Sequence, residues 1–210
     1  MFAAVASLPA IARAETLDRV VASVGDEAIT QRDMAEEYHF ERFLQGESPV
    51  GEPGEADRQA ILSRLISQKL LAQQMGRTAR EPGNGAKMAV ETLNSVRKKF
   101  PDMQAYRSAL DSLGMTEQQV LKRLQLYQRT LRMIDNRLRP ASLPEAKEVE
   151  DYYQKTFVPA YARDHSGPPP ALDDVREQIR EILVQKKMNQ LLGDWLERLK
   201  SAHRVTIHSY

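Results

Sequence analysis

The side chains best suited to acid–base chemistry or metal binding near neutral pH are four histidines: His39, His165, His203 and His208. They are scattered along the chain, and the last two are five residues apart on an expected strand, where odd spacing puts side chains on opposite faces. Cysteine is absent, which excludes disulfides, thiolate nucleophiles and zinc sites built on sulfur. The sequence therefore predicts no metal centre.

Other short motifs give no better evidence of catalysis. The glycines and serine of residues 46–51 miss the G-x-S-x-G spacing of a nucleophile elbow by one residue, and no strand precedes them. Residues 83–85 lack the Lys-Ser/Thr pair and the strand of a phosphate loop. Acidic clusters at 148–151 and 173–174 fit helix starts and exposed faces. We expect no catalytic residue, no cofactor and no enzymatic activity.

Composition and charge describe an ordinary folded chain. Of 210 residues, 41% are hydrophobic and 28% charged, and the formal net charge is +1. A near-neutral balance argues against a dedicated binder of nucleic acid or anionic membranes, although a local basic stripe is compatible with it. No apolar stretch approaches the roughly 20 residues that cross a bilayer. We expect no membrane span.

The first fourteen residues differ from the rest. Residues 2–11 are small and apolar, and Ala12-Arg13-Ala14 matches an A-x-A cleavage site. This pattern predicts a signal peptide over residues 1–14, cleaved after Ala14, and hence export. The basic residues that usually open such a segment are missing, which a start codon further upstream would explain.

The N-terminal half predicts a hairpin and then helices. Residues 17–24 and 28–29 alternate as short strands around a turn at Gly25, and a capping box of Thr30 and Asp33 starts a helix that runs to about Leu44. A loop rich in glycine and proline spans 46–54, and a second helix starts near Asp57 and ends by Gly76. Further helices follow over 89–100 and 103–113, the latter ending at Gly114.

The C-terminal half predicts long helices. Thr116 and Gln119 form a second capping box, and the helix that follows closes at Pro140. Pro144 opens the next helix as its first residue, residues 158–171 form a loop, and a helix spans about 173–202 with one apolar stripe that breaks at Lys186. Residues 204–208 alternate as a strand, and because isolated strands are unstable, the two ends of the chain must pair.

The predicted fold is therefore mainly α, with a small antiparallel sheet formed by the N-terminal hairpin and the C-terminal strand. We expect residues 15–210 to form a single domain.

The two segments that are expected to pair, at the start and the end of the chain, resemble those of a known family. Residues 17–33, LDRVVASVGDEAITQRD, resemble the opening of the SurA-type periplasmic chaperones. The end of the chain is similar to the helix and strand that finish the same chaperone domain, in Trp195, Leu196, Leu199, Ala202, Val205 and Ile207. The resemblance covers nearly all of residues 15–210 and depends on helix order in the middle.

The resemblance implies a function and also a departure from the family. Members commonly carry parvulin-type prolyl isomerase domains at the position of the 158–171 loop, which is too short to bury such a domain. The resemblance thus implies a periplasmic chaperone that acts without ATP and binds unfolded or nascent outer-membrane proteins, without isomerase activity.

A chaperone of this kind needs adaptable apolar side chains on its surface, and methionine suits that task. The candidates for peptide binding lie in the least regular helices: Met88, Met103, Tyr106 and Met115. Methionine and tyrosine at helical spacing are also ordinary core residues, so each candidate has that second interpretation.

Two other functions fit parts of the sequence. Residues 102–129 can form a helix–turn–helix, and the long helix is basic, which would suit a nucleic-acid-binding protein; the basic residues are Lys122, Arg123, Arg129, Arg132, Arg137 and Arg139. Alternatively, the apolar stripe of the same helix is a seam for a homodimer or for another envelope protein, as in a structural assembly partner. The stripe comprises Val120, Leu124, Tyr127, Leu131, Ile134 and Leu138.

Overall fold

The computed structural model describes residues 18–75 and 85–208. The predicted signal peptide, 1–14, and the helix end expected at Gly76 lie outside the described residues. The described chain is mainly helical, with one small sheet, as predicted.

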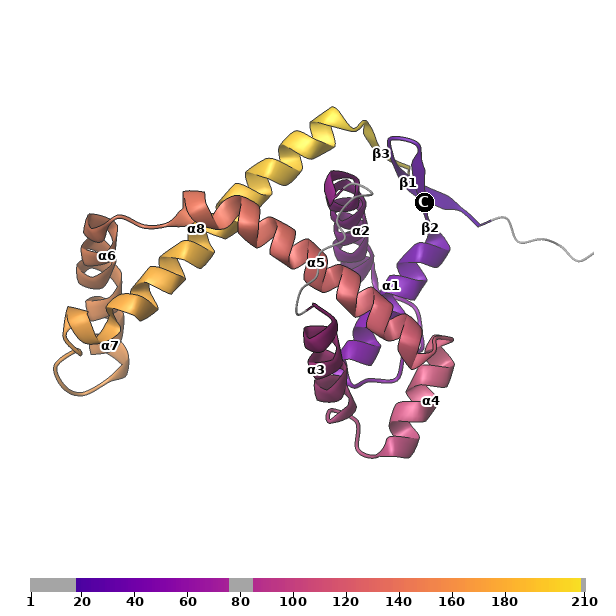
Figure 1. Ribbon diagram of the computed structural model, residues 1–210, viewed down its shortest axis with the longest axis horizontal. Coiled ribbons are helices and arrows are strands. Elements are labelled where there is room, and N and C mark those ends of the chain that lie inside the picture. Colours follow the sequence, from indigo (N-terminus) through magenta and orange to yellow (C-terminus); the bar gives the residue numbers. More distant parts are fainter. Residues whose placement is uncertain (1–17, 76–84, 209–210) are drawn as a thin grey trace, which may run out of the picture.

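The sheet joins segments from the two ends of the described chain (Figure 1). Strands β1 (Val20–Val24) and β2 (Glu27–Thr30) form the hairpin, and β3 (Val205–Ile207) pairs with the other edge of β1. All pairs are antiparallel, in the order β2-β1-β3. The N–H of Gly25, a residue with positive φ, donates to the His203 carbonyl at 2.8 Å. The predicted pairing of the two ends is confirmed.

Helices α1 (Gln31–Gln45) and α2 (Glu55–Met75) lie against this sheet. The capping box of Thr30 and Asp33 starts α1 as predicted, and Gly46 ends it in the left-handed conformation that glycine allows. The buried faces of the sheet and α2 form one core cluster, which Trp195 and Leu199 complete.

A second core cluster lies between α1 and three further helices. Helix α3 spans Gly85–Arg97, α4 spans Met103–Leu113, and α5 spans Glu117–Ser142. Thr116 caps α5 with its predicted capping box, and Gly114 ends α4 at φ 68°. Helix α3 packs along α5, so these helices and the first cluster together form the main body of the molecule.

A smaller unit lies beyond the C-terminal end of α5, around the N-terminal half of α8 (Figure 1). It contains α6 (Ala146–Tyr152), a π-helical turn η1 (Tyr153–Phe157), α7 (Val158–Asp164) and the first half of α8 (Leu172–Ala202). We call residues 146–183 the satellite lobe. Its core cluster has three buried residues, Val149, Val175 and Ile179.

Helix α8 packs in both units, through a different face in each. Ile179 packs in the satellite lobe, whereas Trp195 packs in the first core cluster of the main body. At about 100° per residue, these two side chains point to nearly opposite sides of the helix. The prediction of one stripe that breaks and resumes is therefore wrong: the apolar stripe changes sides, because α8 lies between two separate cores.

Three predictions around prolines are also wrong. Residues 158–171 are not all loop, because α7 continues to Asp164 and only 165–171 are irregular. In the π turn the Val158 N–H donates to the Tyr153 carbonyl, five residues back. This wider turn places Pro159 at the start of α7, where a missing N–H is tolerated.

The other two prolines lie at the ends of helices. Helix α5 continues past Pro140 to Ser142, whose hydroxyl donates to the Arg139 carbonyl at 2.8 Å and so satisfies one group of the last turn. Pro144 precedes α6 rather than opening it. Glu145 is the N-cap residue there, and its N–H donates to the Glu148 carboxylate at 2.8 Å.

Candidate functional site

The apolar stripe of α5 is covered at both ends and open in the middle. Val120 and Leu124 are buried in the second core cluster, and Leu138 is buried in the first. Between them, on the same face by helical spacing, Tyr127 is 56% exposed and Leu131 is 41% exposed. Core-type side chains are thus presented to solvent on a rigid helix.

The first turn of α3 lies beside this open stretch. A Cβ built on Gly85 would come within 2.7 Å of the Arg132 guanidinium, so the start of α3 lies beside the tip of the side chain that follows Leu131 on α5. Met88 lies in that part of α3 and is 42% exposed. We call Met88, Tyr127 and Leu131 the α3–α5 surface. Of its members, sequence reasoning singled out Met88 alone as a binding residue.

The other sequence candidates are not brought together with Met88. Met103 is 50% exposed but starts a different helix, α4, whereas Met88 lies near the start of α3. Met115 is partly buried against the second core cluster. Tyr106 is 2% exposed and packs with Phe43 and Phe100 in that cluster. Tyr106 is therefore a core residue, and its place in the fold does not fit peptide binding.

Tyr106 also belongs to a polar network that fixes α3 and α4 to α5. Its hydroxyl donates to Glu117 at 2.7 Å, and Arg97 donates to the same carboxylate oxygen at 2.5 Å. These hydrogen bonds, that of Arg97 first, lower the pKa of Glu117. Burial raises the pKa of Tyr106. The network holds these helices in place around the second core cluster.

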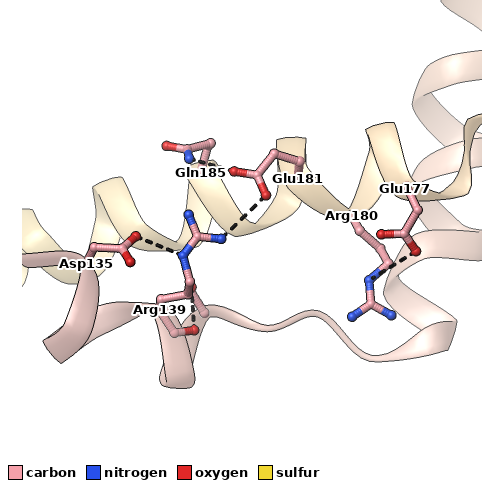
Figure 2. Close-up of polar contacts among 7 residues, drawn as sticks. Asp135, Arg139, Glu177, Arg180, Glu181 and Gln185 are labelled. Atoms are coloured by element: carbon pink, nitrogen blue, oxygen red, sulfur yellow. Dashed lines mark hydrogen bonds and ion pairs between the residues drawn. The ribbon is translucent and has the colours of Figure 1, made fainter. Parts of the chain in front are cut away.

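A chain of polar contacts crosses from α5 to α8 where the satellite lobe joins the main body (Figure 2). Arg139 binds Asp135 on its own helix at 2.8 Å and Glu181 of α8 at 3.5 Å. Gln185 donates to Glu181 at 2.8 Å, and this bond together with Arg139 lowers the pKa of the Glu181 carboxyl. The groups are solvent-exposed, so these contacts contribute little to stability.

The satellite lobe carries a ladder of four stacked rings. Tyr153, Phe157, Tyr161 and His165 recur every four residues, and their ring centroids are 5.7, 6.0 and 4.3 Å apart at interplanar angles of 18°, 29° and 9°. Tyr153 and Phe157 pack against the lobe core, whereas Tyr161 is half-buried outside it and His165 is exposed. We call these residues the aromatic ladder. The spacing of four is visible in the sequence.

Several basic residues of α5 have partners within the protein. Arg123 pairs with Glu37 and lies 3.9 Å from the centroid of the Phe40 ring, Arg137 lies 4.6 Å from that of Trp195, and Arg139 is paired as described. These contacts reduce the positive charge that α5 presents to a nucleic acid.

A hollow of about 270 Å³ lies between α1 and α2. Its lining is largely polar and already paired: Arg42 binds Glu47 at 3.1 Å, and Arg64 binds Glu41. Within residues 18–75 and 85–208, no group of three or more acidic or histidine side chains is placed to hold a metal ion. None of the helices in this described part is long and apolar enough to cross a bilayer.

Comparisons of the chain with protein-family models, with curated proteins and with solved structures found no match.

Proposed function

We propose that this protein is a chaperone of the periplasm that acts without ATP, binds unfolded or nascent outer-membrane proteins and has no prolyl isomerase activity. The observation that carries the proposal is the open middle of the α5 stripe, where Tyr127 and Leu131 face solvent between two buried ends. A holdase needs such a surface, because it must bind apolar segments reversibly and then release them.

Two further features support the proposal. The paired chain ends agree with the resemblance to the SurA-type chaperones, whose chaperone domain the residues of β1, β2 and β3 resemble. Residues 165–171, between α7 and α8, lie within the 158–171 segment that the resemblance aligns with the position where SurA-type chaperones carry isomerase domains, and they are too short to hold one.

The test is dilution of an unfolded outer-membrane β-barrel protein from urea, with and without residues 15–210, followed by light scattering. We expect suppressed aggregation, and we expect the double variant Tyr127→Ser/Leu131→Ser to need about threefold more protein for the same effect, since it removes much of the exposed apolar area. The matched control is Val50→Ser, which removes an equally exposed apolar side chain from the loop between α1 and α2.

Unchanged aggregation over a wide molar excess would refute the holdase proposal and favour a dedicated envelope-assembly partner. Equal loss in the double variant and in Val50→Ser would refute the assignment to the α3–α5 surface. A parallel assay of prolyl peptide isomerisation should show no rate above background, because the proposal includes no isomerase site.

A further inference from the structure

One arginine beside the α3–α5 surface has a charge that no neighbouring group balances. Arg132 directly follows Leu131 on α5, and its side chain is half-buried. In the part of the chain that the structure describes, no carboxylate pairs with Arg132, and its buried Nε–H has no acceptor. A buried donor without an acceptor is costly in a folded protein, so Arg132 gains from an acceptor that binds beside it.

Other arginines of α5 are already engaged within the protein. Arg123 and Arg139 form ion pairs. The Arg137 guanidinium lies 4.6 Å from the centroid of the Trp195 ring. Arg132 differs from these three, because its charge is open to an anion from outside. A nucleic acid is held by several cations along its backbone, whereas a single guanidinium beside apolar side chains suits a segment of polypeptide.

Two contacts fix the place of Arg132 at one end of the α3–α5 surface. Its guanidinium lies beside Gly85, at the start of α3. At the other end of α3, Arg97 donates to Glu117, in the first turn of α5, at 2.5 Å. Helix α3 therefore runs antiparallel along α5. The first turn of α3, which leads to Met88, thus lies at the Arg132 end of the surface.

The surface therefore combines two kinds of recognition. Met88, Tyr127 and Leu131 offer exposed apolar side chains. The planar guanidinium of Arg132 offers N–H donors in a geometry that matches a carboxylate. A segment that satisfies both must be apolar and carry an acidic side chain next to its apolar residues.

We propose that Arg132 binds a carboxylate of the client segment that occupies the α3–α5 surface, so that the surface selects apolar segments containing an aspartate or a glutamate. The inference deepens the proposed function, on which it rests, by naming the class of segment that the chaperone prefers. The guanidinium is partly solvated, so we expect the carboxylate to improve affinity about fivefold.

The test is calorimetric titration of residues 15–210 with two peptides that have blocked ends and differ only at the centre. One is Gly-Ser-Tyr-Leu-Glu-Leu-Tyr-Ser-Gly, and the other has glutamine in place of glutamate. We expect the glutamate peptide to bind about fivefold more tightly. Arg132→Met should abolish this preference, because it removes the charge and keeps an apolar stem.

Two control variants separate the charge from the apolar contacts. Lys122→Met removes an exposed cation from the same helix, ten residues or about 15 Å away, and should leave the preference unchanged. Tyr127→Ser/Leu131→Ser should weaken both peptides by the same factor. If Arg132→Met unfolds α3, as hydrogen exchange would reveal, Arg132→Gln supplies the same test with a polar side chain.

Several outcomes would overturn the inference. Equal binding of the two peptides, binding of neither, or an unchanged preference in Arg132→Met would exclude a carboxylate site at Arg132. Loss of binding to a single-stranded DNA oligonucleotide in Arg132→Met, with the peptide preference intact, would assign Arg132 to a nucleic acid instead. Suppressed aggregation without a preference between the peptides contradicts this inference alone, whereas a preference without suppression contradicts the proposed function.

Discussion

Glu37 of α1 and Arg123 of α5 form an ion pair between the two core clusters of the main body. The Glu37 side chain is 5% exposed and also accepts a hydrogen bond from Gln68 of α2 at 2.8 Å. The Arg123 guanidinium lies over the Phe40 ring as well. One carboxylate therefore connects three helices, and its charge is balanced by a side chain from the helix that carries the α3–α5 surface.

Arg123→Ala should destabilise the protein by about 2–3 kcal/mol, because it leaves the buried Glu37 carboxylate without its cation. Urea unfolding at neutral pH measures the loss. The control is Arg64→Ala, which breaks an exposed pair with Glu41 and should cost less than about 1 kcal/mol. Equal losses in the two variants would show that burial of Glu37 has no energetic effect.

Thr116→Ala should cost about 1 kcal/mol, since the Thr116 hydroxyl accepts from the Gln119 N–H at the start of α5. Thr92→Ala is a matched control: its hydroxyl donates to a carbonyl within α3, and alanine favours a helix interior. Thermal unfolding should separate the two variants. A neutral Thr116→Ala would mean that α5 does not depend on its cap.

The Glu117 network predicts a loss of stability in acid. The pKa of Glu117 is lowered in the folded protein by Arg97 and then Tyr106. Its contribution is therefore present above the ordinary carboxyl pKa and disappears as pH falls through the lowered value. Unfolding free energies between pH 7 and pH 3 should decline less steeply in Glu117→Gln. Parallel pH profiles would exclude the linkage.

The satellite lobe should open independently of the main body, because its core has few buried residues. Ile179→Ala removes a fully buried side chain, which costs about 2–4 kcal/mol. We expect faster hydrogen exchange across 146–183, while the fluorescence of Trp195, the single tryptophan, still reports a folded main body. A simultaneous change in both signals would show that the two units unfold together.

Local sequence signals predicted much of the fold. Thr30 and Thr116 fixed two helix starts and Gly46 and Gly114 two helix ends, because capping depends on a few adjacent residues. The pairing of β1 with β3 followed from the instability of lone strands.

Features that depend on what packs against a helix were not predictable. Periodicity placed Tyr127 and Leu131 on the face of Val120 and Leu124, but it does not tell where the covering helices stop. The apolar stripe of α8 changes sides because the helix packs in two separate cores. The prediction of a single domain gave no reason to expect this change. At Pro159, the general rule that proline ends a helix was overridden by a π turn.

The sheet also has a consequence for the order in which the protein folds. β1 is the central strand, and Val24 pairs with Val205, about 180 positions further along the chain, so this pairing must close a very long loop. Such non-local contacts form late. During synthesis, which starts at the N-terminus, one edge of β1 therefore stays unpaired until nearly all the helices have been made.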